Sequence, residues 1–155
     1  FYTDEYIQLS ESVAICRYLI NRHGNESTLL PSNSIEQQAK EDEWVSFIYG
    51  ELDETSLYVI RRHEALAHIY GEAPNAISAA KEHVLRLLTV VEKFLQSKEF
   101  LLEERFSLAD VFLTTCLDWA HVYGITMPSS LQDYRTSINQ RPAYIKARAI
   151  NYGAN

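Results

Sequence analysis

Glu11 and Ser12 are the residues of this chain whose types and position best suit the binding of a small anion. They stand directly before an apolar periodic segment that begins at Val13, so Ser12 lies at the amino terminus of a predicted helix. The unpaired amides and the dipole of such a terminus favour a carboxylate, and the serine hydroxyl adds a donor. The pattern therefore predicts either a carboxylate site or an ordinary helix cap followed by a buried turn.

The histidines and cysteines lack the spacing of a metal or redox site. No histidine pair stands at i and i+4 around a carboxylate, the arrangement of a helix-borne metal site. Cys16 and Cys116 are far apart and form no CxxC, which indicates free, buried thiols in a reducing compartment. From the residues alone we expect no metal and no catalytic nucleophile.

A capping box opens the most apolar helix that the sequence predicts. Ser107 can accept a hydrogen bond from the amide of Asp110, while the Asp110 carboxylate accepts one from the amide of Ser107. Phe106 before the cap and Val111 after it have the spacing of a hydrophobic staple. The helix that follows is apolar on nearly every face, so we expect it at the centre of a core.

The other predicted elements are assigned from periodicity and caps. Residues 1–9 have the β propensity of one strand, with a turn at Asp4-Glu5. Residues 12–22 have a helical pattern ended by Gly24, and residues 25–34 form a polar linker. Further helices begin at Ser34, Pro74, Ser129 and Pro142, and the first of them extends to about residue 63. Gly50 inside that helix indicates a kink or a close neighbour.

Composition excludes several classes of partner. The 155 residues suffice for one well-buried core, and the net charge of −7 argues against nucleic acid or an anionic membrane. The only basic groupings are Arg61-Arg62 and residues 141–148, which we interpret as solvated faces and helix carboxyl-terminal charges. No apolar run is long enough for a membrane span, and no signal peptide is visible.

Four segments in register resemble one family. Residues 106–110 resemble the start of the central helix in the C-terminal domain of cytosolic glutathione transferases, and residues 8–19 resemble the strand–helix junction of their glutathione-binding domain. Residues 29–31 resemble the linker between the domains, and residues 141–149 the last helix. The family usually has Gly four residues before the capping Ser, where this chain has Glu103. A positive φ there would strain Glu by about 1 kcal/mol.

The resemblance implies a mainly α fold, with a remnant of a thioredoxin-like α/β domain beside a helical bundle. Residues 1–24 would be that remnant, one strand and one helix, and residues 25–34 the linker. Residues 35–155 would be the all-α C-terminal domain.

The resemblance also implies the roles of particular residues. Glu11 and Ser12 would hold the γ-glutamyl end of glutathione, with the backbone of residues 8–10 nearby. A pocket for the hydrophobic electrophile would be lined by side chains of the first long helix and the central helix, with the candidates Tyr49, Asp53, Trp119 and Tyr123.

The activity implied is the conjugation of the glutathione thiolate to hydrophobic electrophiles, in a cytoplasmic homodimer with glutathione as co-substrate and no cofactor. The thiol-activating Tyr, Ser or Cys of the family lies in its first strand–helix unit, upstream of Phe1. The only methionine is Met127, so we expect the chain to be part of something longer and inactive by itself.

Two rival functions remain open. One is a non-catalytic, transferase-like module for protein assembly, as in elongation-factor and tRNA-synthetase complexes. The other is a redox or stress relative that binds glutathione without conjugating it.

Overall fold

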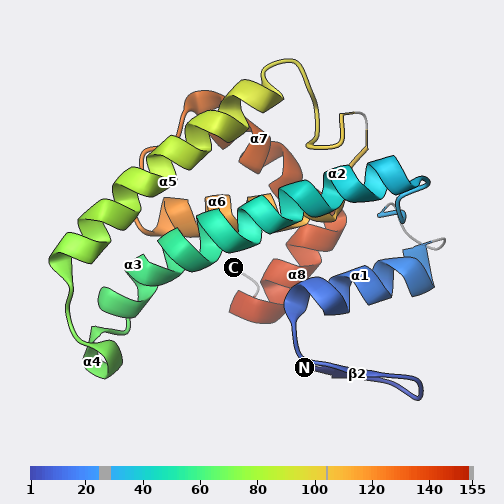
Figure 1. Cartoon of the computed structure of the whole chain (residues 1–155), viewed down its shortest axis with the longest axis horizontal. Helices are drawn as coiled ribbons and strands as arrows, with labels where there is room; N and C mark the ends of the chain where they lie inside the picture. Colours follow the sequence, from blue (N-terminus) through green and yellow to red (C-terminus); the bar gives the residue numbers. More distant parts are fainter. Residues whose placement is uncertain (25–28, 104, 154–155) are drawn as a thin grey trace.

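The computed structural model of the chain describes residues 1–24, 29–103 and 105–153. Helices make up 71% of it, which confirms the predicted mainly α fold. Figure 1 shows a bundle of helices with a small β-hairpin unit at one end. Within the described ranges, no helix combines the length and the apolar character needed to cross a membrane.

The hairpin unit consists of two short strands and one helix. Strands β1 (Tyr2–Thr3) and β2 (Gln8–Leu9) pair antiparallel, and helix α1 spans Ser12–His23. The predicted turn at Asp4-Glu5 is confirmed, but residues 1–9 form two strands and not one, because the Asp4 carboxylate closes that turn into a hairpin. Its Oδ1 accepts hydrogen bonds from the amides of Tyr6 at 2.8 Å and Ile7 at 3.0 Å.

The first helix of the bundle is long and is wound in three parts. It comprises α2 (Ile35–Ser46), the π-helical segment η2 (Phe47–Leu57) and α3 (Tyr58–His63), and the Ser34 hydroxyl caps its start. In η2, the Ser56 hydroxyl and the Tyr58 amide bond carbonyls five residues earlier. Gly50 lies in this segment, and a Cβ there would meet no described atom within 4 Å. The sequence therefore located a departure from α-helix at Gly50, but the predicted close neighbour was wrong.

Five further helices complete the bundle. A short helix that the sequence did not predict, α4 (Ala67–Tyr70), precedes α5 (Pro74–Leu95), which packs against η2 and α3. Helix α6 (Leu108–Val122) runs through the centre and contacts α2, η2 and α7 (Ser129–Asn139). Helix α8 (Pro142–Tyr152) closes the chain against α7.

The amino terminus of α6 is built around the Asp110 carboxylate. Ser107 and Asp110 form a capping box, and both side chains are fully buried. Asp110 accepts hydrogen bonds from the Ser107 amide at 2.8 Å, the Ser107 hydroxyl at 2.7 Å, the Leu101 amide at 2.8 Å and the Tyr134 hydroxyl at 2.7 Å. One carboxylate thus joins α6, α7 and the loop before α6.

Glu103 in that loop has a φ of 65°, the left-handed conformation that favours glycine. This is the conformation for which the sequence predicted strain. The Glu103 side chain is exposed and forms an ion pair with Lys98 at 2.9 Å. The turn is also closed by two backbone hydrogen bonds between Phe100 and Glu103.

Both cysteines are free thiols. Cys116 is buried in the core, and burial raises the pKa of its thiol. Cys16 on α1 is only half-buried, where the sequence predicted full burial, and desolvation raises its pKa as well.

Candidate functional site

Glu11 and Ser12 both lie exposed at the start of α1. Glu11 has an extended backbone with φ −93° and ψ 131°, and its carbonyl accepts the first helical hydrogen bond, from Ile15 at 2.9 Å. The Glu11 side chain makes no capping hydrogen bond to the helix. The first-turn amides and the Ser12 hydroxyl therefore lie at an open end of α1, where an anionic group can reach them.

Tyr49 on η2 lies close enough to this end of α1 to sense its charge. Burial is the main cause of the raised pKa of the Tyr49 phenol, and the carboxylates of Glu54, Glu11 and Asp53 raise it further. The phenol therefore stays protonated at neutral pH and keeps its hydrogen-bond donor. The Glu11 carboxylate of α1 is therefore within electrostatic range of Tyr49, a predicted residue of the electrophile pocket.

Asp53 lies one turn further along η2 and is half-buried. Burial raises the pKa of its carboxyl, the neighbouring Glu54 raises it too, and Arg61 opposes both. This carboxyl is held near a cation and away from bulk water, a combination that occurs often at functional sites.

Arg61 joins Asp53 to the other two predicted pocket residues. Its guanidinium carbon lies 5.3 Å from the ring centroid of Trp119 on α6. Tyr123, the residue that ends α6, has a pKa raised chiefly by burial, and Arg61 counteracts that rise. Arg61 lies in the last turn of α3, which agrees with its interpretation as a helix carboxyl-terminal charge, but it is half-buried and not part of a fully solvated face. It is the functional candidate that the sequence analysis missed.

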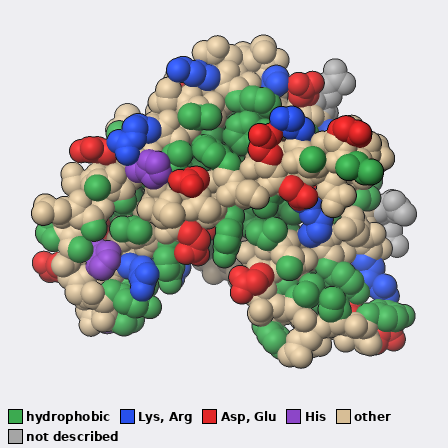
Figure 2. All heavy atoms as spheres, viewed as in Figure 1, with side chains coloured by type: hydrophobic (Ala, Val, Ile, Leu, Met, Phe, Trp, Pro, Cys, Tyr) green, Lys and Arg blue, Asp and Glu red, His purple; other side chains and the backbone are tan. Residues whose placement is uncertain are grey.

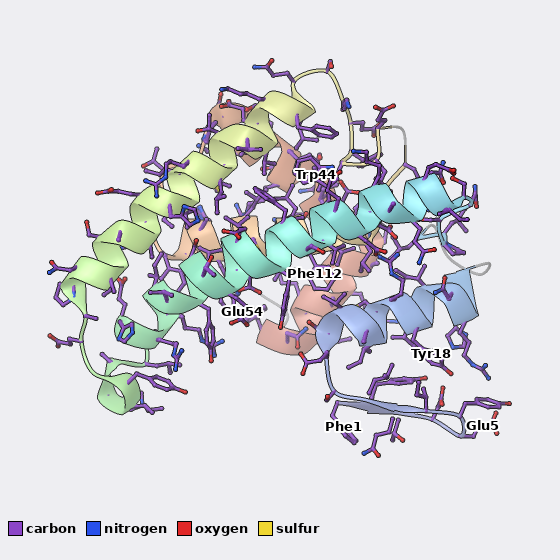
Figure 3. The ribbon with its side chains drawn as sticks, viewed as in Figure 1. Phe1, Glu5, Tyr18, Trp44, Glu54 and Phe112 are labelled. Carbon is purple, nitrogen blue, oxygen red and sulfur yellow. The ribbon has the colours of Figure 1, made fainter. Side chains whose placement is uncertain are left out.

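Figure 2 shows a hollow in the surface between the α4 end of the molecule and the hairpin unit, with acidic side chains at its edge. Glu54, labelled in Figure 3, projects from η2 on this side of the long helix. The chemistry available among the predicted site residues comprises helix amides, a neutral phenol, the Asp53 carboxyl of raised pKa and an arginine over an indole. Such a set suits the positioning of a polar ligand beside an apolar one.

Three cavities lie away from the start of α1. One of about 950 Å³ lies between α2 and α5 and has Trp44, Phe47 and Phe94 in its wall, with none of the predicted site residues. A second, of about 530 Å³, lies between α3 and α5 and also contains none of them. The third, of about 450 Å³, lies between α6 and α8 and includes Trp119. Volume alone therefore does not select the site, and we weigh the perturbed groups near α1 more heavily.

A metal centre has no support in the described part of the chain, where no three His, Cys, Asp or Glu side chains cluster suitably. Asp118, a carboxyl of the central helix, instead joins helices. It accepts hydrogen bonds from Arg135 at 2.5 Å and from the Tyr144 hydroxyl at 2.6 Å. These contacts tie α6 to α7 and α8.

Comparison with known proteins points in one direction. Residues 74–149 match the sequence model described as "Glutathione S-transferase, C-terminal domain". Glutathione S-transferase GstA of Escherichia coli O157:H7 is 26% identical over 126 residues, which are 80% of this chain and 57% of GstA. The chain thus spans little more than half of that relative.

A second relative belongs to another functional class. Elongation factor 1-gamma of Schizosaccharomyces pombe is 31% identical over 121 residues, 76% of this chain and 28% of that protein. Among solved structures, Ure2p5 from Phanerochaete chrysosporium, cocrystallized with 1-(S-glutathionyl)-2,4-dinitrobenzene, superposes with a TM-score of 0.79 and 19% identity. That superposition covers 95% of this chain and 72% of Ure2p5, and it shows a shared fold.

Proposed function

Because the chain belongs to the glutathione S-transferase family, we propose that it binds glutathione through Glu11 and Ser12 at the start of α1. The observation that carries the proposal is the exposed start of α1, which has no side-chain cap. A γ-glutamyl group has a carboxylate, which suits the first-turn amides and the Ser12 hydroxyl. It also has an ammonium group, which suits the Glu11 carboxylate.

The activity we propose for the complete protein is transfer of the glutathione thiolate to a hydrophobic electrophile. Tyr49, Asp53, Trp119 and Tyr123 would line the electrophile side of the site. The Trp119 indole offers an apolar face, and Arg61 above it would attract an electron-rich substituent. We assign the thiol-activating role to none of the tyrosines of this chain, and we expect these residues alone to be inactive in conjugation.

A homodimer is part of the same proposal, through the cavity between α2 and α5. Its wall combines aromatic side chains with charges of both signs, for example Lys93 and Glu43. A surface with both signs can pair with its own copy across a twofold axis. Val90 in this wall is 50% exposed, so Val90→Asp should shift the protein from dimer to monomer in light scattering. An unchanged mass would reject this face as the interface.

A cytoplasmic location is proposed as well. Two free thiols, one of them only half-buried, support a reducing compartment.

The likeness to elongation factor 1-gamma favours a second candidate, a non-catalytic module for protein assembly. The two candidates differ in what they require of the α1 end. A transferase needs Ser12 to contact its ligand, whereas an assembly module needs only the fold. Glutathione binding therefore discriminates them, although a glutathione-binding relative without conjugating activity would also pass that test.

The test is a calorimetric titration of glutathione into the wild type, Ser12→Ala and Ser78→Ala. Ser78 is an exposed serine of α5 and serves as the matched control. Ser12→Ala should weaken binding about 10- to 150-fold, the equivalent of one charge-assisted hydrogen bond. Ser78→Ala should bind as the wild type does. Equal dissociation constants for all three proteins would reduce Glu11-Ser12 to an ordinary helix start.

A further inference from the structure

Glu41 on α2 is a buried carboxylate that meets three other segments of the chain. Its side chain is 2% exposed. Oε2 pairs with Arg17 of α1 and accepts a hydrogen bond from the Ser32 hydroxyl at 3.3 Å. Oε1 accepts one from the Leu108 amide at 3.2 Å, and the Arg105 guanidinium lies 3.8 Å away. Glu41 therefore touches α1, the segment before α2 and the start of α6 at once.

Arg105 extends this cluster along the segment between the hairpin unit and the bundle. It donates hydrogen bonds to the carbonyls of Leu30 at 2.7 Å and Pro31 at 3.0 Å, and to the Ser32 hydroxyl at 3.1 Å. An ionised carboxylate in a buried position is tolerated only where charges and donors surround it. Because these partners come from separate segments, the position of each is fixed relative to the others.

Helix α1 also contacts the bundle through apolar side chains: Ile20 is buried in the core, and Val13 and Cys16 are partly buried against it. Among the described residues, Arg17 provides the ion pairs of α1 with the bundle. Arg17 lies five residues after Ser12, which is about one and a half helical turns. The contact between Arg17 and Glu41 therefore holds α1 close to its anion-binding end.

We propose that Glu41 is a positioning residue: through Arg17 it fixes α1 on the long helix of the bundle, and so holds Glu11 and Ser12 in place at the end of α1. This inference rests on the proposed glutathione site, and it adds a residue that touches no ligand. Losing the Glu41 charge releases Arg17. Helix α1 then moves relative to η2, and Glu11 and Ser12 are displaced from the rest of the proposed site.

Asp42 provides a matched control because it is the neighbouring acid and also pairs with Arg17. Its side chain is 53% exposed, compared with 2% for Glu41. An exposed ion pair is screened by water and contributes little. Asp42→Asn should therefore leave the position of α1 unchanged, although it removes the same type of charge from the same arginine.

The experiment compares the wild type, Glu41→Gln and Asp42→Asn by amide hydrogen exchange without ligand and by glutathione titration. Glutamine keeps the size of the side chain and an acceptor for Leu108. In Glu41→Gln we expect residues 12–23 to exchange at least tenfold faster, while protected amides of α5 change less than twofold. The glutathione dissociation constant should rise at least tenfold. Asp42→Asn should stay within threefold of the wild type in both measurements.

Several outcomes overturn the proposal. Equal acceleration in α1 and α5 would show a general loss of stability, and unchanged exchange in α1 would show that Glu41 does not hold it. Faster exchange in α1 with unchanged glutathione affinity would show that the contact between Glu41 and Arg17 holds α1 but does not position the glutathione site. If the wild type binds no glutathione, the proposed function fails, and with it the positioning role, while the exchange data still decide whether Glu41 holds α1. Should Glu41→Gln not fold, Arg17→Met breaks the same contact from α1 and leaves Glu41 bonded to Leu108.

Discussion

The hairpin unit of residues 1–24 and the helical bundle of residues 35–152 are each organised around one aspartate, in opposite environments. Asp4 accepts hydrogen bonds from two turn amides and from the hydroxyls of Tyr18 at 2.8 Å and Tyr2 at 3.1 Å. Asp110 also accepts four, but its side chain is fully buried. Hydrogen bonds that water can replace contribute little, and those that it cannot replace are costly to lose.

Because of this difference, the two regions have different roles. Most of the apolar core belongs to the bundle, to which α1 adds Ile20, and the candidate ligand end is the exposed start of α1 in the hairpin unit. Local changes in the hairpin unit should therefore alter binding without unfolding the bundle, whereas changes at Asp110 should unfold it.

The largest expected effect is that of Asp110→Ala. It leaves the Tyr134 hydroxyl and the Leu101 and Ser107 amides without their acceptor in a dry environment. We expect a loss of about 3–5 kcal/mol in the free energy of unfolding. Urea denaturation followed by circular dichroism measures it, with the exposed Asp133→Ala on α7 as the control. An unchanged midpoint would show that the carboxylate contributes nothing to the bundle.

A smaller, local effect is expected at Asp4. The amide of Tyr6 is the main cause of a pKa lowered to about 2, and the hydroxyl of Tyr18 and the amide of Ile7 assist. Because the folded-state pKa is depressed, the contribution of Asp4 is present above the unfolded pKa of about 4. It is lost as the pH falls through about 2.

Asp4→Asn should therefore speed amide exchange of residues 2–9 at pH 6, with α5 unaffected. The difference between variant and wild type should disappear near pH 2. A difference that persists at pH 2, or that spreads to α5, would contradict the separation of the two regions.

The smallest expected effect is that of Glu103→Gly in the loop before α6. Glycine relieves the positive φ of 65° but removes the ion pair with Lys98. The strain is worth about 1 kcal/mol, and an ion pair at such an exposed position rarely more than half of that. We expect Glu103→Gly to raise the free energy of unfolding by roughly 0.5 kcal/mol, as measured by thermal denaturation. Lower stability in Glu103→Gly would mean that the Lys98 pair outweighs the strain.

The helices of the bundle could largely be predicted from sequence because their signals are local. Pro74, Pro142 and the caps at Ser34 and Ser107 begin helices where the structure has them. The π winding of η2 could not be predicted, since a widened helix depends on how its neighbours pack. The hairpin was missed because strands of two residues have no periodicity to detect.

The candidate site could be predicted only in part. Glu11 and Ser12 have a local signal, the start of a helix. Arg61 was missed because charge patterns identify a helix end and cannot reveal a tryptophan 58 positions later beneath the guanidinium. Glu41 was missed for the same reason, as its partner Arg17 lies 24 positions earlier.

The most direct test of the account is a nuclear magnetic resonance titration of the ¹⁵N-labelled chain with glutathione. We expect the largest amide shift changes at residues 8–14, around the start of α1, and at residues 49–53 of η2, with little change along α5. Changes confined to the cavity between α2 and α5, or none at residues 8–14, would contradict it.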